Sequence, residues 1–577
     1  MIRDFFSLHN FRNQLTSYEA LPQLVILGLV CGILTGLLIA AFRLAIDIPL
    51  SFMLIDDVEN FEDLSIQARF LLPSLGGITI ALLIAYWPLM RSKVGIVYLL
   101  ERLAYHQGQI PGKSLFAQFI LAVIALVSGQ SVGREGPAVY MGAGVASLLG
   151  HYLKVPFNVN RLLLACGGAA AISAAFNTPL AGVIFAMEVI LLDYTIAGFT
   201  PIIVAAVTSS LITRLIFSAE PIFQIPAFDL LDHYEILWIM FLGVFIGTVA
   251  TIFIKLMNLV KLKITYSLSY KLAIAGILTG FVAIFYPQVM GTGYDTIIDS
   301  MWGRIDIQLL LYILVAKLLL TAIILGLGMP AGMIGPTLFI GAVSGALLGI
   351  SGSYFAESSV SHVGLYTMLG MGAMMAATLN APLAALIALL ELTYNPHIIF
   401  PAMIAIVVAN LTTQYLFRTP SAFLASLQAQ GFDYRIQPLA QVLNRVSVGK
   451  VMDRSICTYD NDDLLNKSLI ENTSAKWLVI KEQQQYVQAY LIADITAHFT
   501  HQVSSQLATQ DSQDLELASL QHLSVDIIKV NVRDTLSTAL IFMNQHQTDT
   551  LCVFSHSEQV IGIITREQVE YYYNNVQ

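Results

Sequence analysis

The sequence predicts an all-α polytopic membrane protein with inverted internal repeats and broken helices, followed by a small α+β cytoplasmic region. Three observations lead to this fold class. Of the 577 residues, 56% are hydrophobic and only 12% are charged, whereas a soluble protein averages about 25% charged residues. Motifs of the apolar part recur once at a constant offset. From about residue 443 the composition changes, and polar and acidic residues become common.

The N-terminal segment, residues 1–20, differs from the apolar body, residues 21–442. The segment carries charged residues before the first apolar run, so we expect a cytoplasmic lead-in without a signal peptide. The body contains runs of spanning or near-spanning length. These are Leu21–Phe42, Phe70–Tyr86, Ile236–Ile254, Leu272–Phe285, Leu309–Leu327 and Ile398–Tyr415. Shorter runs interrupted by Gly or Pro, such as Leu162–Ala175 followed by Leu180–Leu192, predict the broken helices that mark a transporter's binding site.

The body divides into two halves, about 21–218 and 235–430, that share a motif. Ala175–Gly182 (AFNTPLAG) corresponds to Thr378–Ala385 (TLNAPLAA). The offset is 203 residues for the asparagines, for the prolines and for the later Glu188 and Glu391. Homologous halves with an odd number of spans each face opposite ways, so their helix ends would converge near the membrane midplane.

The string Gly133-Arg134-Glu135-Gly136-Pro137 lies between two apolar runs and therefore at membrane depth. Pro137 suits the first turn of a helix, and a helix that begins inside a bilayer presents unpaired N–H groups and a positive dipole end to an anion. Glu135 places a carboxylate where that anion would bind, as a gate does. An ordinary loop at the membrane surface is the alternative. The recurrence of Gly-x-x-Gly-Pro at Gly332–Pro336, again between apolar runs, favours a site.

Residues 443–577 predict a soluble module. From Arg445 to the end there are 9 basic and 16 acidic residues, a balance that argues against nucleic-acid binding. Two copies of a pattern are expected, each with a helix and two strands. The helices are Leu464–Ile470 and Leu536–Met543, the strands are Trp477–Ile480, Val487–Ile492, Leu551–Phe554 and Val560–Ile564, and Gln502–Gln513 would connect the copies.

No enzyme, cofactor or metal site is predicted. The four cysteines are scattered without metal or disulfide spacing, and the histidines form no ligand pattern. We find no nucleophile–base arrangement and no phosphate-binding loop.

With these motifs, the chain resembles the CLC family of chloride channels and proton–chloride exchangers over about Leu21–Gln430. The tail resembles a pair of CBS domains, through Val448–Met452 and Gly562–Arg566. The resemblance implies a lipid-embedded homodimer with a separate anion pathway in each subunit. It also implies a multi-pass protein of a bacterial inner membrane, with both termini cytoplasmic.

The resemblance also assigns site residues. Glu135 matches the external gating glutamate. Val94, in Lys93–Ile96, matches an anion-coordinating serine; Ile334 matches a phenylalanine, and Phe423 an anion-coordinating tyrosine. The other expected anion-binding residues are Gly95, Ile96, Gly133, Arg134, Gly136 and Met333. Because Val94 and Phe423 lack hydroxyl donors, each worth about 1.5–3 kcal/mol to a charged acceptor, we expect weak anion binding that depends on main-chain N–H groups.

Coupling to protons depends on Val189. Exchangers resembling this chain carry an internal proton-transfer glutamate there, and an aliphatic side chain cannot relay a proton. The leading hypothesis is passive, glutamate-gated conduction of chloride or a similar monovalent anion. Proton-coupled exchange, with Glu188 or water as the inner relay, is the alternative. Glu188 and Glu391 also fit structural acids bonded to backbone at helix ends.

Three further hypotheses remain open. Fluoride export, divalent-cation transport with CBS regulation and a membrane-tethered nucleotide sensor each fit part of the pattern. Adenine nucleotide at the CBS pair would use Thr565 and Arg566, but Gln568 replaces the carboxylate that would bind the ribose.

Overall fold

A computed structural model describes residues 21–54, 60–192, 196–217, 223, 233–353, 361–432, 442–460, 465–466, 473–482, 485–505, 514–515, 522, 524–555 and 558–575. The chain divides into two compact units. One comprises Leu21–Leu153 and Asn160–Arg435, and the other contains Ile436–Gln577 with Lys154–Val159. The sequence-based boundaries, 1–20, 21–442 and 443–577, stay a prediction.

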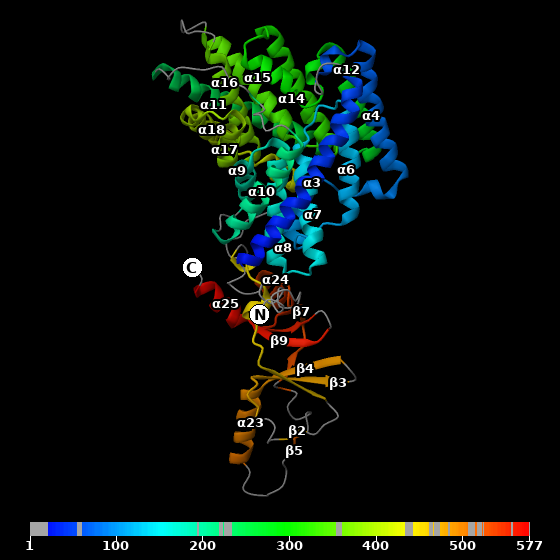
Figure 1. Cartoon of the computed structure of the whole chain (residues 1–577). Helices are drawn as coiled ribbons and strands as arrows, with labels where there is room; N and C mark the ends of the chain where they lie inside the picture. Colours follow the sequence, from blue (N-terminus) through cyan, green and yellow to red (C-terminus); the bar gives the residue numbers. More distant parts are fainter. Residues whose placement is uncertain are drawn as a thin grey trace. The chain divides into compact units, whose positions relative to one another are not determined.

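The helical unit is built from helices of very different length (Figure 1). They are α3 (Leu21–Met53), α4 (Ile66–Tyr86), α5 (Ile96–Tyr105), α6 (Gly112–Val127), α7 (Glu135–Tyr152), α8 (Phe157–Phe176), α9 (Pro179–Phe185), α10 (Ile196–Ile216), α11 (His233–Lys263), α12 (Leu268–Phe285), α13 (Tyr294–Met301), α14 (Ile307–Leu327), α15 (Ile334–Ser353), α16 (Ser361–Leu379), α17 (Pro382–Thr393), α18 (Ile399–Leu411) and α19 (Ala422–Gln428). Short 3₁₀ turns are η1 (Phe61–Asp63), η2 (Pro88–Arg91), η4 (Pro287–Val289) and η5 (Pro396–Ile398), and π-helical turns are η3 (Ala186–Leu191) and η6 (Thr412–Leu416).

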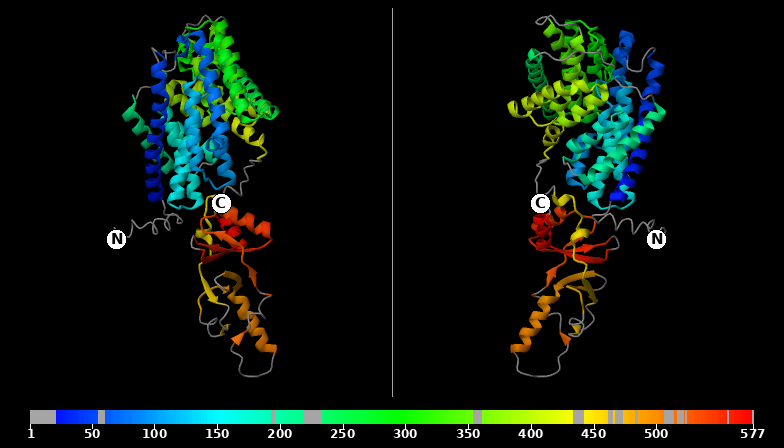
Figure 2. Two further views of the ribbon diagram at one scale, coloured as in Figure 1. Left: turned by 90° about the vertical axis from the view of Figure 1, so that its right-hand side faces the viewer. Right: turned by 60° about the vertical axis from the view of Figure 1, so that its left-hand side comes forward.

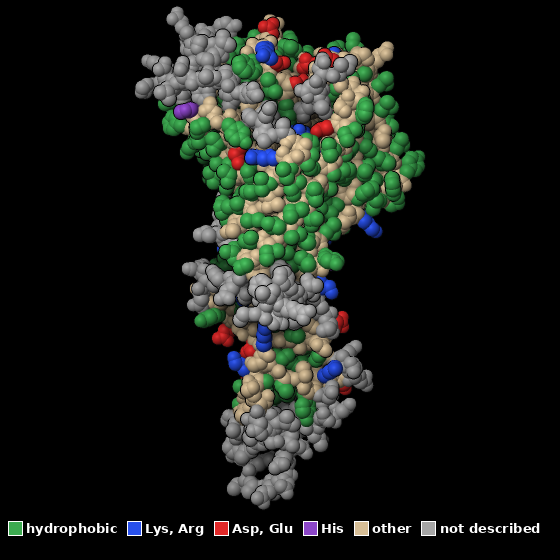
Figure 3. Space-filling model, viewed as in Figure 1, with side chains coloured by type: hydrophobic (Ala, Val, Ile, Leu, Met, Phe, Trp, Pro, Cys, Tyr) green, Lys and Arg blue, Asp and Glu red, His purple; other side chains and the backbone are tan. Residues whose placement is uncertain are grey.

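The unit is an integral membrane body. Within the described ranges, nine helices are long and apolar enough to cross a membrane, and every apolar run predicted to span lies inside a helix or, for Ile398–Tyr415, inside α18 with its flanking 3₁₀ and π turns. Large apolar side chains such as Leu37 and Phe281 are more than half exposed, as lipid-facing residues are. On the face in Figure 3, hydrophobic side chains cover most of this unit and charged ones are few.

Close helix packing in both halves depends on glycine. Helix α6 lies alongside both α3 and α4, as the views in Figures 1 and 2 agree. Deeper inside, Gly142 of α7 touches the carbonyl of Gly167 of α8, and Gly341 of α15 touches the carbonyl of Gly370 of α16 in the same way. A side chain at any of the four would collide with the facing backbone, so these helices approach more closely than larger residues permit.

The two halves are related by reciprocal contacts. Glu188 of η3 accepts main-chain N–H bonds from Leu383 (3.2 Å) and Ala384 (2.8 Å) at the start of α17. Glu391 of α17 accepts the corresponding bonds from Leu180 (3.0 Å) and Ala181 (2.8 Å) at the start of α9. Each half therefore supplies a carboxylate to a helix start of the other half. This reciprocal arrangement is expected of two inverted repeats and agrees with the predicted fold class.

The C-terminal unit is α+β, as predicted. One sheet has the order β1 (Ile456–Asp460), β3 (Trp477–Glu482), β4 (Gln485–Leu491), β6 (Val525–Asp526), and another the order β7 (Lys529–Asn531), β8 (Thr550–Phe554), β9 (Val560–Thr565). The helices are α21 (Val448–Val451), α23 (Ile492–Ser505), α24 (Leu536–His546) and α25 (Arg566–Asn575). In each sheet an antiparallel hairpin, β3–β4 or β8–β9, pairs with a parallel strand, β1 or β7.

Two local predictions in the tail were wrong. Leu465–Asn466, within a segment predicted to be helical, form strand β2 because they pair with β5 (Asp514–Leu515). The start of the predicted connection, residues 502–505, instead completes α23. The rest of both segments lies outside the described residues.

Candidate anion-binding site

The two glycine strings meet inside the helical unit. Gly133 and Gly332 form an antiparallel bridge, with N–O distances of 2.8 Å and 2.7 Å between the main-chain N–H of each and the carbonyl of the other. A Cβ atom on Gly136 would lie 2.7 Å from the Cα atom of Gly332, so only glycine permits this approach. The predicted convergence is confirmed. The alternative of a surface loop does not hold, because both strings are largely buried.

Two helices start at this junction. Helix α7 begins at Glu135 and α15 at Ile334, each within two residues of the bridge. No side chain caps the start of α7. The first N–H groups of a helix have no partner within it, and they carry the positive end of its dipole. The junction therefore presents two positive helix ends to one buried space.

Glu135 occupies that space. Its side chain has 0% exposure. One carboxylate oxygen, Oε2, accepts the main-chain N–H of Gly335 at 3.0 Å, and the other, Oε1, accepts the hydroxyl of Tyr294 at 2.9 Å. A carboxyl group thus fills the space between the two helix starts. The guanidinium of Arg134, 5.6 Å from the centre of the Tyr294 ring, adds positive charge nearby.

The segment Val94–Ile96 lies on a neighbouring element, at the start of α5. Gly95 has φ of 91°, a conformation that favours glycine. A Cβ atom there would meet nothing within 4 Å, so Gly95 borders open space. Val94 is half-buried and Ile96 is buried. Helix α5 packs against α7 and α19, and the ring of Tyr98, near its start, lies 6.2 Å from that of Tyr140 of α7. That Val94, Gly95 and Ile96 face the same anion site stays a prediction.

Phe423, Met333 and Ile334 are all buried. Phe423 is the second residue of α19, whose N-terminal Ser421 hydroxyl accepts the N–H of Leu424 at 3.3 Å. Met333 and Ile334 stand between the Gly332 bridge and Gly335. Met333 and Ile334 lie close to Glu135 because they directly precede Gly335, its main-chain donor. Val94 precedes α5 and Phe423 lies on α19, and these two helices pack against each other.

Val189 and Glu188 lie on η3, a different element from the two glycine strings. Val189 is buried, and both oxygens of Glu188 accept N–H groups from the start of α17. This is the bonding expected of a structural acid at a helix end. Its role in proton transfer stays a prediction.

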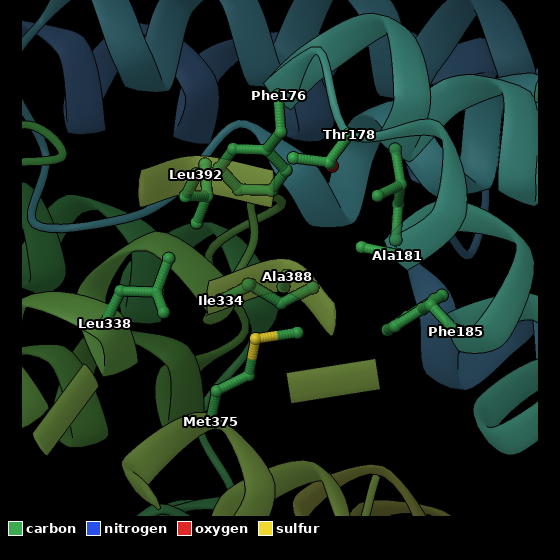
Figure 4. Close-up of a pocket in the computed structure, with 10 residues that line it drawn as sticks. Phe176, Thr178, Ala181, Phe185, Ile334, Leu338, Met375, Ala388 and Leu392 are labelled. Atoms are coloured by element: carbon green, nitrogen blue, oxygen red, sulfur yellow. The ribbon is translucent and has the colours of Figure 1, made fainter. Parts of the chain in front are cut away.

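An apolar pocket lies between the two halves (Figure 4). Its lining comes from α8, α9, α15, α16 and α17, and Thr178 is the sole polar residue among the ten. The lining residues are Ile172, Phe176, Thr178, Ala181, Phe185, Ile334, Leu338, Met375, Ala388 and Leu392. Ile334 precedes the Gly335 donor of the Glu135 site, and Phe185 precedes η3. Apart from Thr178, the side chains that line the pocket between Ile334 and Phe185 are apolar.

Sequence reasoning missed two residues, Tyr294 and Lys317. Tyr294 starts α13 and contacts Glu135 directly. Lys317, in α14, has 0% exposure, and its ammonium donates to the carbonyls of Val289 and Gly291 at 2.9 Å each. A lysine within the apolar run Leu309–Leu327 was a readable signal, because ionisable residues inside membrane spans are rare and functional. Nothing in the sequence marked Tyr294.

In the tail, Thr565 and Arg566 bond within the fold. The N–H of Thr565 donates to the Gln568 side chain at 3.0 Å, and the N–H of Gln568 donates to the Thr565 hydroxyl at 3.4 Å. This is a capping box for α25. Arg566 pairs with Asp549 at 2.5 Å. Gln568 thus has a structural use at the position where a ribose-binding carboxylate was sought.

The repeated halves, the paired helix starts and the buried carboxylate between them are features of a membrane transport protein. Residues 76–414 match the protein family described as "Voltage gated chloride channel", and the chain belongs to this family.

Several known proteins are similar over most of the helical unit. "Putative chloride channel protein ClcB-like" of Ralstonia nicotianae is 30% identical over 367 residues, 62% of this chain and 85% of that protein. "Voltage-gated ClC-type chloride channel ClcB" of Escherichia coli is 29% identical over 408 residues, 68% of this chain and 96% of that protein.

Solved structures share the fold. A slow cyanobacterial Cl⁻/H⁺ antiporter superposes with a TM-score of 0.63 at 22% identity, covering 71% of this chain and 98% of that one. A CLC-type fluoride/proton antiporter gives 0.59 at 21% identity, covering 71% and 99%. A eukaryotic CLC transporter gives 0.60 at 17% identity, covering 96% and 99%, so that likeness extends into the C-terminal unit.

Proposed function

We propose that this chain conducts chloride or a similar monovalent anion passively across a membrane, and that the Glu135 carboxylate is its gate. The observation that carries the proposal is the fully buried carboxylate bonded to Gly335 N–H where α7 and α15 begin. An anion at this position would use the same donors. Passage therefore requires the carboxylate to leave, and protonation weakens its bonds to both donors.

Passive conduction is supported by the surroundings of Val189. An exchanger needs a titratable group or ordered water on the inner side. Here the corresponding side chain is aliphatic, and both oxygens of the adjacent Glu188 are engaged by α17. The pocket between Ile334 and Phe185 is lined by apolar side chains and Thr178.

Proton-coupled anion exchange is the second candidate. It is supported by the fold, which is shared with structures described as a Cl⁻/H⁺ antiporter and a fluoride/proton antiporter. In that case Glu188 would have to leave α17, or water would have to enter the apolar pocket, to complete the inner relay. The anion would be chloride or fluoride.

Anion flux from liposomes, with and without an imposed proton gradient, separates the two. For passive conduction we expect a reversal potential that follows the anion gradient alone. A reversal potential that shifts in a fixed ratio with the proton gradient would establish exchange and refute the passive proposal. Replacing chloride by fluoride in the same assay identifies the preferred anion.

Assembly and location follow from family membership as proposals. We propose a homodimer in the bacterial inner membrane, with both termini in the cytoplasm and a C-terminal CBS pair that could take an adenine nucleotide. The divalent-cation hypothesis is weaker. It needs grouped carboxylates, whereas Glu135, Glu188 and Glu391 are each bonded to a different helix start.

A further inference from the structure

The Glu135 carboxylate has a second donor besides the backbone. Tyr294 Oη lies 2.9 Å from Oε1, while Gly335 N lies 3.0 Å from Oε2. Both side chains are buried, with exposures of 0% for Glu135 and 7% for Tyr294. A hydroxyl that donates to a carboxylate stabilises the ionised form, and a buried environment strengthens this bond. The tyrosine is thus placed to favour the charged, blocking state.

The position of Tyr294 is fixed by its immediate neighbours. Gly293 precedes it with φ of 77°, and a Cβ atom on Gly293 would lie 2.6 Å from the Phe339 ring. The Tyr294 ring meets Phe223 edge-on, with centroids 5.8 Å apart, and the Arg134 guanidinium lies over it. The hydroxyl is therefore aimed at Glu135 by packing that involves no part of Glu135.

The loop before Tyr294 is anchored as well. Lys317 donates to the carbonyls of Val289 and Gly291, and its ammonium lies 4.6 Å from the centre of the Phe339 ring. Gly291 N–H also bonds the carbonyl of Gly129, in the segment that leads to Glu135 (3.3 Å). The segments that precede Tyr294 and Glu135 are thus hydrogen-bonded to each other. This bonding fixes the distance between the main chains of the two residues.

We propose that Tyr294 is a positioning residue that latches Glu135 in the blocking position, and that its hydroxyl sets how much external acid opens the pathway. This inference rests on the proposed gating by Glu135. Tyr294 would regulate the gate from α13, which lies outside both glycine strings. When the carboxylate takes up a proton, the Tyr294 bond loses its charge assistance, and the latch releases together with the Gly335 bond.

Other charged groups around α7 do not replace this donor. Helix α15 bonds Glu135 by backbone alone and carries no titratable side chain. Asp295 follows Tyr294 on α13, and Lys317 of α14 is bonded to the loop carbonyls. The charged groups on the other helices packed against α7 are Arg43 and Asp47 of α3, which pair at 3.1 Å, Glu101 and Arg102 of α5, Lys113 of α6, and Arg161 of α8, which donates to the carbonyl of Leu103 at 2.9 Å. On α5 and α7, the phenols of Tyr98 and Tyr140 pack ring to ring, with centroids 6.2 Å apart.

The test is the external pH dependence of anion flux in liposomes for Tyr294→Phe. Loss of one hydrogen bond to a charged acceptor should move the pH of half-maximal flux upward by roughly one to two pH units. The flux at the acidic plateau should match that of the unaltered chain, which also shows that the variant is folded. An unchanged midpoint would overturn the proposal.

Tyr140→Phe is the matched control. Tyr140 is also fully buried, on α7 itself, and its hydroxyl donates to Ser114 at 2.7 Å. Its removal is the same chemical change away from Glu135, so the midpoint should stay in place. An equal shift in Tyr140→Phe would assign the effect to general loosening and also overturn the latch.

Two further variants separate the latch from the gate. In Glu135→Gln, flux should already be high and independent of pH, and adding Tyr294→Phe should change nothing. If Glu135→Gln keeps a steep pH response, the proposed function fails; if it is flat while Tyr294→Phe does not shift, only the latch fails. Should Tyr294→Phe not fold, 3-fluorotyrosine at position 294 keeps the ring in place and makes the hydroxyl a stronger donor. The midpoint should then move to lower pH, and a shift upward or no shift would refute the latch.

Discussion

Glu135→Gln removes the charge of the blocking side chain and keeps its size. The glutamate accepts two hydrogen bonds, from Gly335 N–H at 3.0 Å and from the Tyr294 hydroxyl at 2.9 Å. The glutamine amide has a single acceptor oxygen, so it retains at most one of these bonds, and that one becomes neutral. The blocked state therefore loses one charge-assisted bond and about half the strength of the other.

The cost to the blocked state follows from these bonds. A bond to a charged group contributes about 1.5–3 kcal/mol and a neutral one about 1 kcal/mol, so the total loss is about 3 kcal/mol. At 1.4 kcal/mol for each factor of ten, the ratio of open to blocked pathways should rise about 100-fold at neutral pH. In acid the unaltered chain should approach the same flux, since its carboxylate is then protonated.

Chloride efflux from liposomes, recorded from neutral to acidic external pH, measures this ratio. Glu391→Gln is the matched control, because Glu391, like Glu135, accepts two hydrogen bonds, in its case both from main-chain N–H groups at the start of α9. We expect Glu391→Gln to keep the acid dependence of flux. If flux through Glu135→Gln still climbs steeply with acid, or if Glu391→Gln abolishes the dependence equally, Glu135 is not the gate.

Three other changes test neighbouring parts of the structure. Val94→Ser adds a hydroxyl donor beside the open space at Gly95 and should tighten chloride binding about 10-fold or more; unchanged affinity by calorimetry would mean that Val94 does not line the site. Lys317→Met leaves two loop carbonyls unpaired and should cost about 2–3 kcal/mol of stability, seen as a lower Tm in detergent. Lys317→Arg should cost less. A Tm for Lys317→Met equal to that of the unaltered chain would contradict the anchoring role. At Asp453, burial would raise the carboxyl pKa, but two hydrogen bonds from Ser455 and the Lys476 ammonium outweigh it and lower the pKa below its usual value. Asp453→Asn should therefore destabilise the C-terminal unit by about 1 kcal/mol above the pKa of an unfolded aspartate, and the difference should vanish as pH falls through the lowered value; hydrogen exchange of β3 in the full chain measures it, and a pH-independent difference would refute the assignment.

Much of the fold was predictable because its physical signals are local and repeated. Apolar runs long enough to span a membrane became helices, and the 203-residue offset between Glu188 and Glu391 became a set of reciprocal hydrogen bonds. The glycine strings were predictable for the same reason. A break in an apolar run at equivalent places in two inverted halves brings both breaks to one place.

The contacts of the site were less accessible. Tyr294 reaches Glu135 from 159 residues away, and no periodicity or motif in the sequence records that distance. For Leu465–Asn466 the local pattern predicted a helix, but the two residues form a strand because they pair with a distant strand, β5. Gln568 was read as a missing nucleotide ligand, whereas its side chain completes the start of α25. In each case a long-range or capping partner, invisible in the local pattern, decided the outcome.

The exchange of carboxylates between the halves bears on how such a chain can be divided. Glu188 completes the start of α17, and Glu391 completes the start of α9, so either half expressed alone would leave a helix start without the carboxylate that accepts its N–H groups. Two half-length chains should consequently be stable only when they are made together and inserted head to tail.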